Sequence, residues 1–228
     1  MTGGEGRAAL FDIDGTLTDT NHLHVVCWWE ALRQSGHRVP MGAVHRAVGL
    51  PGDELVAHLL GPGDEEEHER IHTAHGVLYA TYHDRLPALD GAADLLRRLA
   101  GDGWEVVLVT SASGAQLDAL RRAIGADEAI TAWTSADDVE RGKPHPEPLN
   151  QALDLVGVGA DRAVFVGDTV WDMRAAVRAG VSRVGVLSGG IPAGDLRAAG
   201  AEAVYEGPRD VLAGLGTGPF ARLPGAGG

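Results

Sequence analysis

Residues 8–19 read Ala-Ala-Leu-Phe-Asp-Ile-Asp-Gly-Thr-Leu-Thr-Asp, and this stretch decides the fold. The apolar run from Ala8 to Phe11 is typical of a buried strand. It ends in Asp12 and Asp14, which flank one apolar residue, and Gly15 then supplies the backbone freedom that a chain reversal needs. In open α/β sheets, ligands bind outside the carboxyl ends of the strands. The stretch therefore predicts two acids at the ligand-binding edge of a parallel sheet.

Strand-like and helix-like segments alternate along most of the chain. Apolar runs bounded by turn residues recur at 8–11, 104–109, 130–133, 163–166 and 181–187. Segments with the apolar spacing of helices lie between several of them, at 91–100, 115–124, 147–156 and 171–179. This alternation predicts an α/β fold, a Rossmann-like parallel sheet with helices on both faces. Right-handed crossovers then bring the carboxyl ends of all the strands to one edge.

The region 19–85 breaks this alternation, because it holds helical stretches and no clear strand. We interpret it as an inserted α-helical cap domain, and residues 1–18 together with 86–228 as the catalytic core. Nine of the ten histidines lie in the insertion, and three of them, His68, His72 and His75, share one helical face. No further metal ligand accompanies these three, so we expect a solvated polar face there. The segment 208–228 is rich in glycine and proline, and we expect its last residues to be loose.

Composition excludes several classes of function. A formal net charge of −13 argues against nucleic acid or an anionic membrane as partner. No apolar run reaches the roughly 18 residues of a membrane span, and the first residues contain no secretory signal. The single cysteine, Cys27, fits a reducing compartment. These features predict a cytoplasmic protein, in which an anionic substrate would need a local cation such as a metal ion.

The acid pair after the first strand suits phosphoryl transfer. As a nucleophile, Asp12 would attack phosphorus and form an aspartyl phosphate, which divides hydrolysis into two easier steps. Asp14, two residues later, projects from the same side of the chain. It is placed to protonate the leaving oxygen and then to deprotonate water. Its backbone carbonyl is also a candidate ligand for Mg²⁺, which prefers oxygen donors.

Other predicted strands end in residues that complement this pair. Thr110 and the backbone of Ser111 can hold phosphoryl oxygens near the start of a helix. Lys143, the only lysine of the chain, stands in Gly-Lys-Pro and supplies a point charge for the nucleophile and the phosphoryl group. Asp168 ends the run 163–167 and can bind Mg²⁺, while Asp172 is better placed for a water bound to the metal. Asp172 also fits a helix cap.

In these motifs the chain resembles the haloacid dehalogenase superfamily. Four signatures occur in order, carried by Asp12-Ile-Asp14-Gly15-Thr16, Thr110, Lys143, and the segment from Asp168 to Asp172. The resemblance implies a Rossmann-like core, a helical cap after the first strand, and Mg²⁺. It also implies that Asp12 is the nucleophile, that Asp14 is the acid–base, and that these two acids bind the metal together with Asp168.

The second acid also indicates the branch of the superfamily. The dehalogenase branch lacks it, so Asp14 favours the phosphatases, among them proteins like phosphoglycolate phosphatase. His24 lies ten residues after Asp14, where β-phosphoglucomutase-like relatives carry a cap histidine that assists acid–base chemistry. Arg46 is a candidate for the far end of the substrate. We expect a Mg²⁺-dependent phosphatase for a small phosphorylated metabolite. The alternatives are a phosphosugar mutase, a non-catalytic binding module and a dehalogenase.

Overall fold

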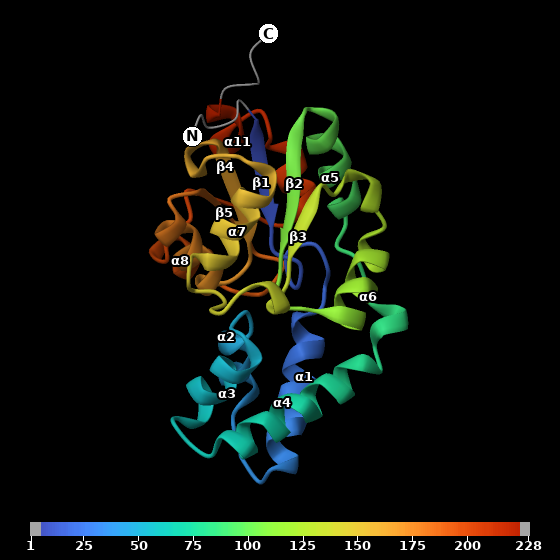
Figure 1. Ribbon diagram of the computed structural model, residues 1–228, viewed down its shortest axis with the longest axis vertical. Coiled ribbons are helices and arrows are strands. Elements are labelled where there is room, and N and C mark those ends of the chain that lie inside the picture. Colours follow the sequence, from blue (N-terminus) through green and yellow to red (C-terminus); the bar gives the residue numbers. More distant parts are fainter. Residues whose placement is uncertain (1–5, 224–228) are drawn as a thin grey trace.

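The computed structural model describes residues 6–223 and has a six-stranded parallel sheet at its centre (Figure 1). The strand order is β3-β2-β1-β4-β5-β6. The strands are β1 (Arg7–Phe11), β2 (Trp104–Val109), β3 (Ala132–Thr134), β4 (Ala163–Gly167), β5 (Ser182–Val186) and β6 (Ala203–Tyr205). Phe11, the last residue of β1, lies opposite Leu108 on one side and Val166 on the other. The strand that carries the acid pair is therefore central, as expected where both sheet faces are covered.

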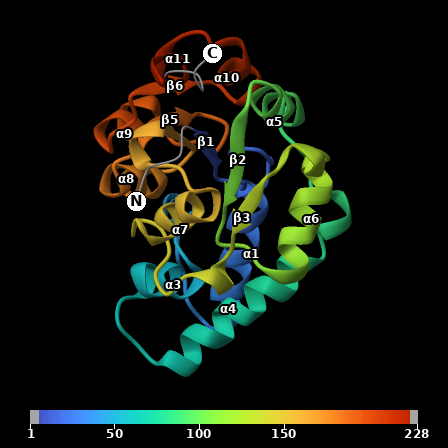
Figure 2. The ribbon, with the colours of Figure 1, turned by 45° about the horizontal axis from the view of Figure 1, so that its top comes forward.

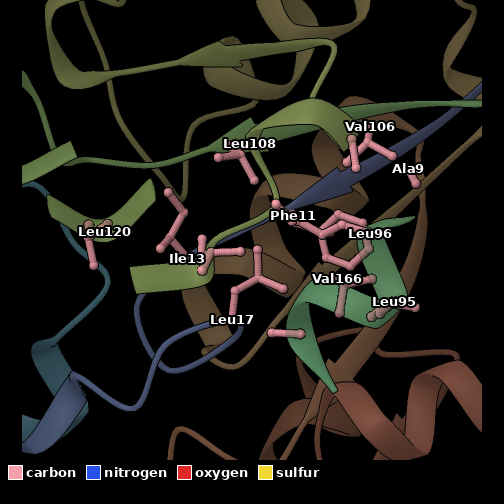
Figure 3. Packing of buried hydrophobic residues seen from close by; sticks show 14 of the residues in the cluster. Ala9, Phe11, Ile13, Leu17, Leu95, Leu96, Val106, Leu108, Leu120 and Val166 are labelled. Atoms are coloured by element: carbon pink, nitrogen blue, oxygen red, sulfur yellow. The ribbon is translucent and has the colours of Figure 1, made fainter. Parts of the chain in front are cut away.

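Helices cover both faces of the sheet, which confirms the predicted α/β class. They are α5 (Ala92–Gly101), α6 (Gly114–Ile124), α7 (Glu147–Val156), α8 (Val170–Ala179), α9 (Ala193–Ala198), α10 (Pro208–Ala213) and α11 (Gly218–Arg222). Alternate residues of β1 point to opposite faces. Ala9 and Phe11 pack with α5 and α6 (Figure 3), whereas Ala8 and Leu10 pack with α7 and α8.

Residues 203–223 form more regular structure than the sequence predicts. The glycine- and proline-rich segment contains α10 and α11, whose Val211 and Phe220 are buried in the same apolar cluster as Phe11. The expectation of a loose end concerns residues 224–228, which lie outside the described part of the chain. Within that part, no helix combines the length and the hydropathy that crossing a membrane requires.

Four helices occupy the region between β1 and α5. They are α1 (Asn21–Gln34), α2 (Met41–Ala47), α3 (Gly52–Leu60) and α4 (Glu65–Ala80). They have an apolar cluster of their own, which includes Val25, Leu32, Val44, Val56 and Ile71. Figures 1 and 2 show them together beyond the carboxyl ends of the central strands. We call residues 21–80 the helical segment.

Two antiparallel stretches of chain connect the helical segment to the sheet. The Asp19 amide donates to the Pro87 carbonyl (2.9 Å), and the Leu89 amide donates to the Leu17 carbonyl (2.9 Å). Further contacts join it to loops of the core. His45 Nε2 lies 2.8 Å from the Gly189 carbonyl oxygen, and the Trp171 indole donates to the Arg46 carbonyl (3.1 Å). These contacts hold the helices against the sheet edge where Asp12 and Asp14 lie.

Candidate active site

A tight turn after β1 directs both acids to the sheet edge. The Ile13 carbonyl accepts hydrogen bonds from the amides of the three residues 16–18. Gly15 has a φ of +80°, which favours glycine. A Cβ at this position would lie 2.4 Å from the Asn21 amide nitrogen and 2.5 Å from an Asp168 carboxylate oxygen. The glycine therefore provides both the chain reversal and the space for the acids that meet here.

The lone lysine lies at the centre of the converging strand ends. Lys143 Nζ is 2.5 Å from Asp12 Oδ1 and 2.8 Å from Asp172 Oδ1, and it also donates to the Val109 carbonyl (3.4 Å). Its side chain is only 3% exposed. These contacts join β1, β2 and α8 through one buried ammonium group. Segments that are 131 residues apart in sequence thus meet, as the motif spacing predicts.

Three buried carboxylates surround this lysine. Within residues 6–223, Asp12, Asp168 and Asp172 form the one group of His, Cys, Asp and Glu side chains that can hold a metal ion, with ligand atoms within 4.8 Å of one another. Burial raises the pKa of Asp12 to about 7, against the opposing charge of Lys143. Burial, followed by the charge of Asp12, also raises the pKa of Asp168 well above its usual value. One lysine does not balance three acids, so the cluster has the charge and the donors that suit a divalent cation.

Two neighbouring side chains orient the acids. Asn21 Nδ2 donates to Asp168 Oδ2 (2.7 Å), and Thr16 Oγ1 lies 3.1 Å from Asp168 Oδ1 and 3.2 Å from Asp12 Oδ2. The buried Asn21 Oδ1 has no hydrogen-bond partner among the described residues. A buried polar atom without a partner is rare and is often explained by an ion or water. This atom therefore supports the fit of the acid cluster to a hydrated metal ion.

Asp172 both caps a helix and pairs with the lysine. Its Oδ2 accepts from the Thr169 amide (3.0 Å) and hydroxyl (2.6 Å), and its own amide donates back to Thr169 Oγ1 (3.1 Å). This reciprocal capping arrangement begins α8. Its other oxygen, Oδ1, faces Lys143. The helix cap that the sequence allows for Asp172 is therefore present, and the contact with Lys143 is an additional one.

Asp14 faces the helical segment. Its Oδ1 accepts from Thr20 Oγ1 (2.5 Å) and Tyr79 Oη (3.5 Å), and it lies 3.2 Å from His24 Nε2. Burial alone would raise the pKa of this carboxyl, but His24 and the Thr20 hydrogen bond lower it below its usual value. The side chain of Asp14 is not part of the three-acid group. Its carboxylate instead faces Thr20, His24 and Tyr79.

A buried imidazole pair extends inward from Asp14. His24 Nδ1 lies 3.0 Å from His75 Nε2, and the His75 ring stacks on Trp28 with centroids 3.8 Å apart. Burial, followed by the charge of His24, lowers the pKa of His75 well below its usual value. The expectation of a solvated face is therefore wrong for His75, because α1 packs Trp28 and His24 directly against it. The spacing of the α4 histidines could not reveal this, since it says nothing about the opposing helix.

Thr110 and Ser111 lie beside the acids at the end of β2. Thr110 Oγ1 accepts from the Ala112 amide (3.0 Å), and the Thr110 amide donates to the Thr134 carbonyl (3.1 Å). Helix α6 begins later, at Gly114, so Thr110 is not its cap. The hydroxyl is instead held within the loop that leads from the sheet edge to the helix.

A cavity of about 130 Å³ unites most of the predicted site residues. From the core it is lined by Asp12, Asp14, Thr110, Ser111, Lys143 and others. From the helical segment it is lined by His24, Trp28, Leu50, Leu55, His72 and others. Arg46 is not among the lining residues, and its side chain is exposed on α2. The structure therefore brings His24 to the acids and leaves Arg46 outside. The structure also places three residues beside the site that were not predicted as site residues, namely Asn21, Thr16 and His75.

Known proteins resemble this chain in sequence and in architecture. The model of a haloacid dehalogenase-like hydrolase family matches residues 7–180. The chain is 30% identical to validoxylamine A 7'-phosphate phosphatase of Streptomyces hygroscopicus subsp. limoneus, over 80% of this chain and 86% of that protein. It is 29% identical to the pyrophosphatase PpaX of Bacillus cereus, over 79% and 82%. The crystal structure of a hydrolase from Pseudomonas syringae superposes with a TM-score of 0.87 at 34% identity, over 92% and 97%.

Proposed function

Because the chain belongs to the haloacid dehalogenase-like hydrolase family, whose members among its relatives include phosphatases, we propose that it is a Mg²⁺-dependent phosphomonoesterase. Its substrate is a small phosphorylated metabolite, and the reaction passes through an aspartyl phosphate on Asp12. The observation that carries this proposal is the pairing of Asp12 with buried Lys143. Both residues line one cavity together with Asp14. The formal net charge of −13 argues against a nucleic-acid partner and favours a small free metabolite, which we place in the cytoplasm.

Asp12 performs the first step. Lys143 holds its carboxylate, so an oxygen of Asp12 is fixed in orientation as it attacks phosphorus. The P–O bond to the alcohol breaks, and the leaving oxygen takes a proton from Asp14. Thr110 and the Ser111 backbone lie in the same cavity, where they can hold the phosphoryl oxygens. The product of this step is the free alcohol, and the phosphoryl group stays on Asp12.

Asp14 performs the second step. Its ionised carboxylate accepts a proton from water, which attacks the phosphorus of the aspartyl phosphate and releases inorganic phosphate. The lowered pKa of Asp14 favours this ionised form. The proton from water then resides on Asp14, and His24, 3.2 Å from the same oxygen, is placed to hold it and to return it to Asp14 before the next phosphoryl transfer. Asp12 is thereby regenerated as a carboxylate, and Lys143 pairs with it again.

Asp12 and Asp168, with the backbone carbonyl of Asp14, are the residues that would hold Mg²⁺. Asp172 and Asn21 would orient these acids or the water bound to the ion. When bound, Mg²⁺ screens the negative charge between a nucleophilic carboxylate and a phosphate and polarises the phosphoryl oxygens. The raised pKa of Asp12 and Asp168 in the protein without the ion supports this assignment, because the cluster lacks positive charge.

We assign residues 19–85 to a cap domain and residues 1–18 and 86–228 to the catalytic core. The separate apolar cluster of α1–α4 supports this division, as do the two stretches of chain that join it to the core. A cap in this place closes over the substrate and excludes water, as lids commonly do. It also supplies His24, Trp28 and His72 to the cavity.

Asp12→Asn tests the proposed function. The amide is nearly the same size as the carboxylate but is a poor nucleophile, so we expect no phosphate release from p-nitrophenyl phosphate in the presence of Mg²⁺. The circular dichroism spectrum should match that of the wild type. Asp154→Asn, on the exposed surface of α7, is the matched control and should keep wild-type turnover. Wild-type turnover in Asp12→Asn would refute the nucleophilic role.

The contact between His24 and Asp14 favours one second candidate, a phosphosugar mutase of the β-phosphoglucomutase kind. A mutase would return the phosphoryl group from Asp12 to a sugar hydroxyl instead of to water. Hexose 1-phosphates with a bisphosphate activator separate the two activities. Isomerised sugar without free phosphate identifies a mutase, and free phosphate without isomerised sugar identifies the phosphatase.

A further inference from the structure

The cavity at the acids adjoins a second cavity that is lined by further carboxylates. The second cavity, of about 240 Å³, shares Gly52, His72, Thr110, Ser111 and Lys143 with the first. Its other lining residues include Asp53, Glu54 and Glu140. The space for the part of the substrate beyond the phosphoryl group is thus bordered by three carboxylates that the phosphatase chemistry does not use. Together the two cavities lie at the low end of the roughly 300–1,000 Å³ of pockets for drug-sized ligands, so this part is small.

Lysine and arginine contribute one side chain to the lining of these cavities. Among residues 6–223, Lys143 is the one lysine or arginine that lines either cavity. Its ammonium group already pairs with Asp12 and Asp172 and is almost fully buried. A substrate with a second anionic group would find no further lysine or arginine among these lining residues. Recognition of a carboxylate or second phosphate normally uses an arginine or lysine of its own.

The arginines nearest in sequence to the lining residues do not fill this role. Arg46 is exposed on α2 and lines neither cavity. Arg141 is close enough to Glu54 to lower the pKa of that carboxyl, but it lines neither cavity either. Burial, followed by the charge of Asp53, nevertheless raises the pKa of Glu54. Arg141 and His145 both oppose this shift, but the carboxylates of Asp53, Glu54 and Glu140 outnumber Lys143 in the lining of the second cavity, so we expect an anionic leaving group there to meet repulsion.

The cavities contain amide, hydroxyl and imidazole groups where a second anion would need a lysine or an arginine. Gln116 and Ser111 line the first cavity, and His72 lines both. Amide, hydroxyl and imidazole groups donate and accept hydrogen bonds, which suits hydroxyl groups of a ligand. Apolar side chains, including Leu50 and Leu55, border the same space. This mixture matches a carbon chain or ring that carries several hydroxyl groups.

We propose that the leaving group of the substrate is a small uncharged polyol, so that the substrate has its phosphate as its one anionic group. The proposal rests on the proposed phosphatase function and selects among its substrates. It excludes phosphorylated carboxylic acids and bisphosphates as preferred substrates. It also separates this chain from the activity named in its pyrophosphatase relative, because the leaving group of inorganic pyrophosphate is itself an anion.

Matched pairs of substrates test the proposal. Glucose 6-phosphate and 6-phosphogluconate have the same number of carbons and differ by a carboxylate, as do glycerol 3-phosphate and 3-phosphoglycerate. We expect kcat/KM for phosphate release to be at least tenfold higher for the uncharged member of each pair, and inorganic pyrophosphate to be poorer than both uncharged members. Assays at pH 8 keep imidazoles largely uncharged. Equal values within both pairs, or higher values for the carboxylates, would overturn the proposal.

Charge reversal at the second cavity supplies an independent measurement. Glu54→Lys should lower the preference for the uncharged member at least threefold, and the ratio within each pair cancels any general loss of activity. Asp154→Lys makes the same charge change on the exposed surface of α7, away from both cavities, and should leave the ratio unchanged. Equal shifts in the two variants would also overturn the proposal. Failure to release phosphate from any ester, p-nitrophenyl phosphate included, would instead refute the phosphatase function itself.

Discussion

Asp168→Asn is expected to stabilise the metal-free protein and to abolish its response to Mg²⁺. Carboxylate oxygens of Asp12, Asp168 and Asp172 lie within 4.8 Å of one another. Two unit charges at that distance repel each other by about 3.5 kcal/mol at an effective dielectric constant of about 20. Attraction by Lys143 and the uptake of protons at raised pKa values offset part of this repulsion. We therefore expect a net gain of about 1–2 kcal/mol in unfolding free energy.

The hydrogen bonds of Asp168 survive the substitution, which isolates the electrostatic effect. Asn21 donates to one oxygen of Asp168 and Thr16 to the other. The new amide can turn its oxygen toward Asn21 and its nitrogen toward Thr16 Oγ1. Thr16 then donates to Asp12 Oδ2, which already lies 3.2 Å away. No buried polar group loses its partner, so the usual cost of an unsatisfied donor does not arise.

Thermal unfolding in EDTA and in excess Mg²⁺ measures both effects. For a chain of this size, 1–2 kcal/mol corresponds to a rise in Tm of roughly 2–8 °C in EDTA. The wild type should gain stability when Mg²⁺ is added, because a ligand that binds only the folded state stabilises it, whereas the variant should gain none. Asp154→Asn should behave like the wild type in both conditions. A lower Tm than the wild type in EDTA, or a wild-type response to Mg²⁺, would refute the reasoning.

Three other expected outcomes concern the same buried groups. Burial raises the pKa of Asp12 from 3.8 to about 7. The folded state therefore binds more protons than the unfolded state in this window, so metal-free stability should fall as the pH rises from about 4 to about 7. Urea unfolding should show a shallower slope for Asp12→Asn, because Asp168, whose pKa is also raised, keeps its own contribution. Lys143→Met should cost about 3–5 kcal/mol in unfolding free energy and remove turnover, because it leaves buried carboxylates without their cation; an unchanged urea midpoint would contradict this. His75→Phe keeps a ring against Trp28 but loses the hydrogen bond to His24, so kcat should fall about fivefold with little change in KM. His75→Gln should recover most of that loss, and wild-type kcat in the Phe variant would count against a positioning role for His75.

The sheet and the convergence of the acids could be predicted because they depend on local signals. Each of Asp12, Thr110 and Asp168 follows an apolar run, and parallel strands place such ends at one edge. Strand β6 was not predicted, because Ala203–Tyr205 lies in no apolar run like those of β1–β5. Helices α9–α11 have only five or six residues each, which is too short for a helical hydrophobic period. Their stability comes from packing instead, as the buried Phe220 shows.

The contribution of the helical segment to the site could be predicted only in part. His24 was identified through the resemblance to β-phosphoglucomutase-like relatives, which carry a cap histidine ten residues after the second acid. His75 depends on how α4 packs against α1, and Asn21 on how the turn at Gly15 approaches it. Contacts of this kind form between two elements, so neither element alone has a hydrophobic period or a motif that predicts them. The same holds for Arg46, whose exposure follows from the orientation of α2.

The central position of β1 has a consequence for the nascent chain. Its neighbours in the sheet begin at Trp104 and Ala163, about 100 and 160 residues later. At bacterial and eukaryotic elongation rates, β1 leaves the ribosome roughly 5–20 s before the first of them. Helices α1–α4 are synthesised in that interval and can bury their own apolar cluster, while Leu10 and Phe11 have no strand to join. Translation thus completes helices α1–α4 first and the surroundings of Asp12 last, and a message truncated before β4 yields a chain in which β1 lacks one neighbour and Asp168 and Asp172 are absent.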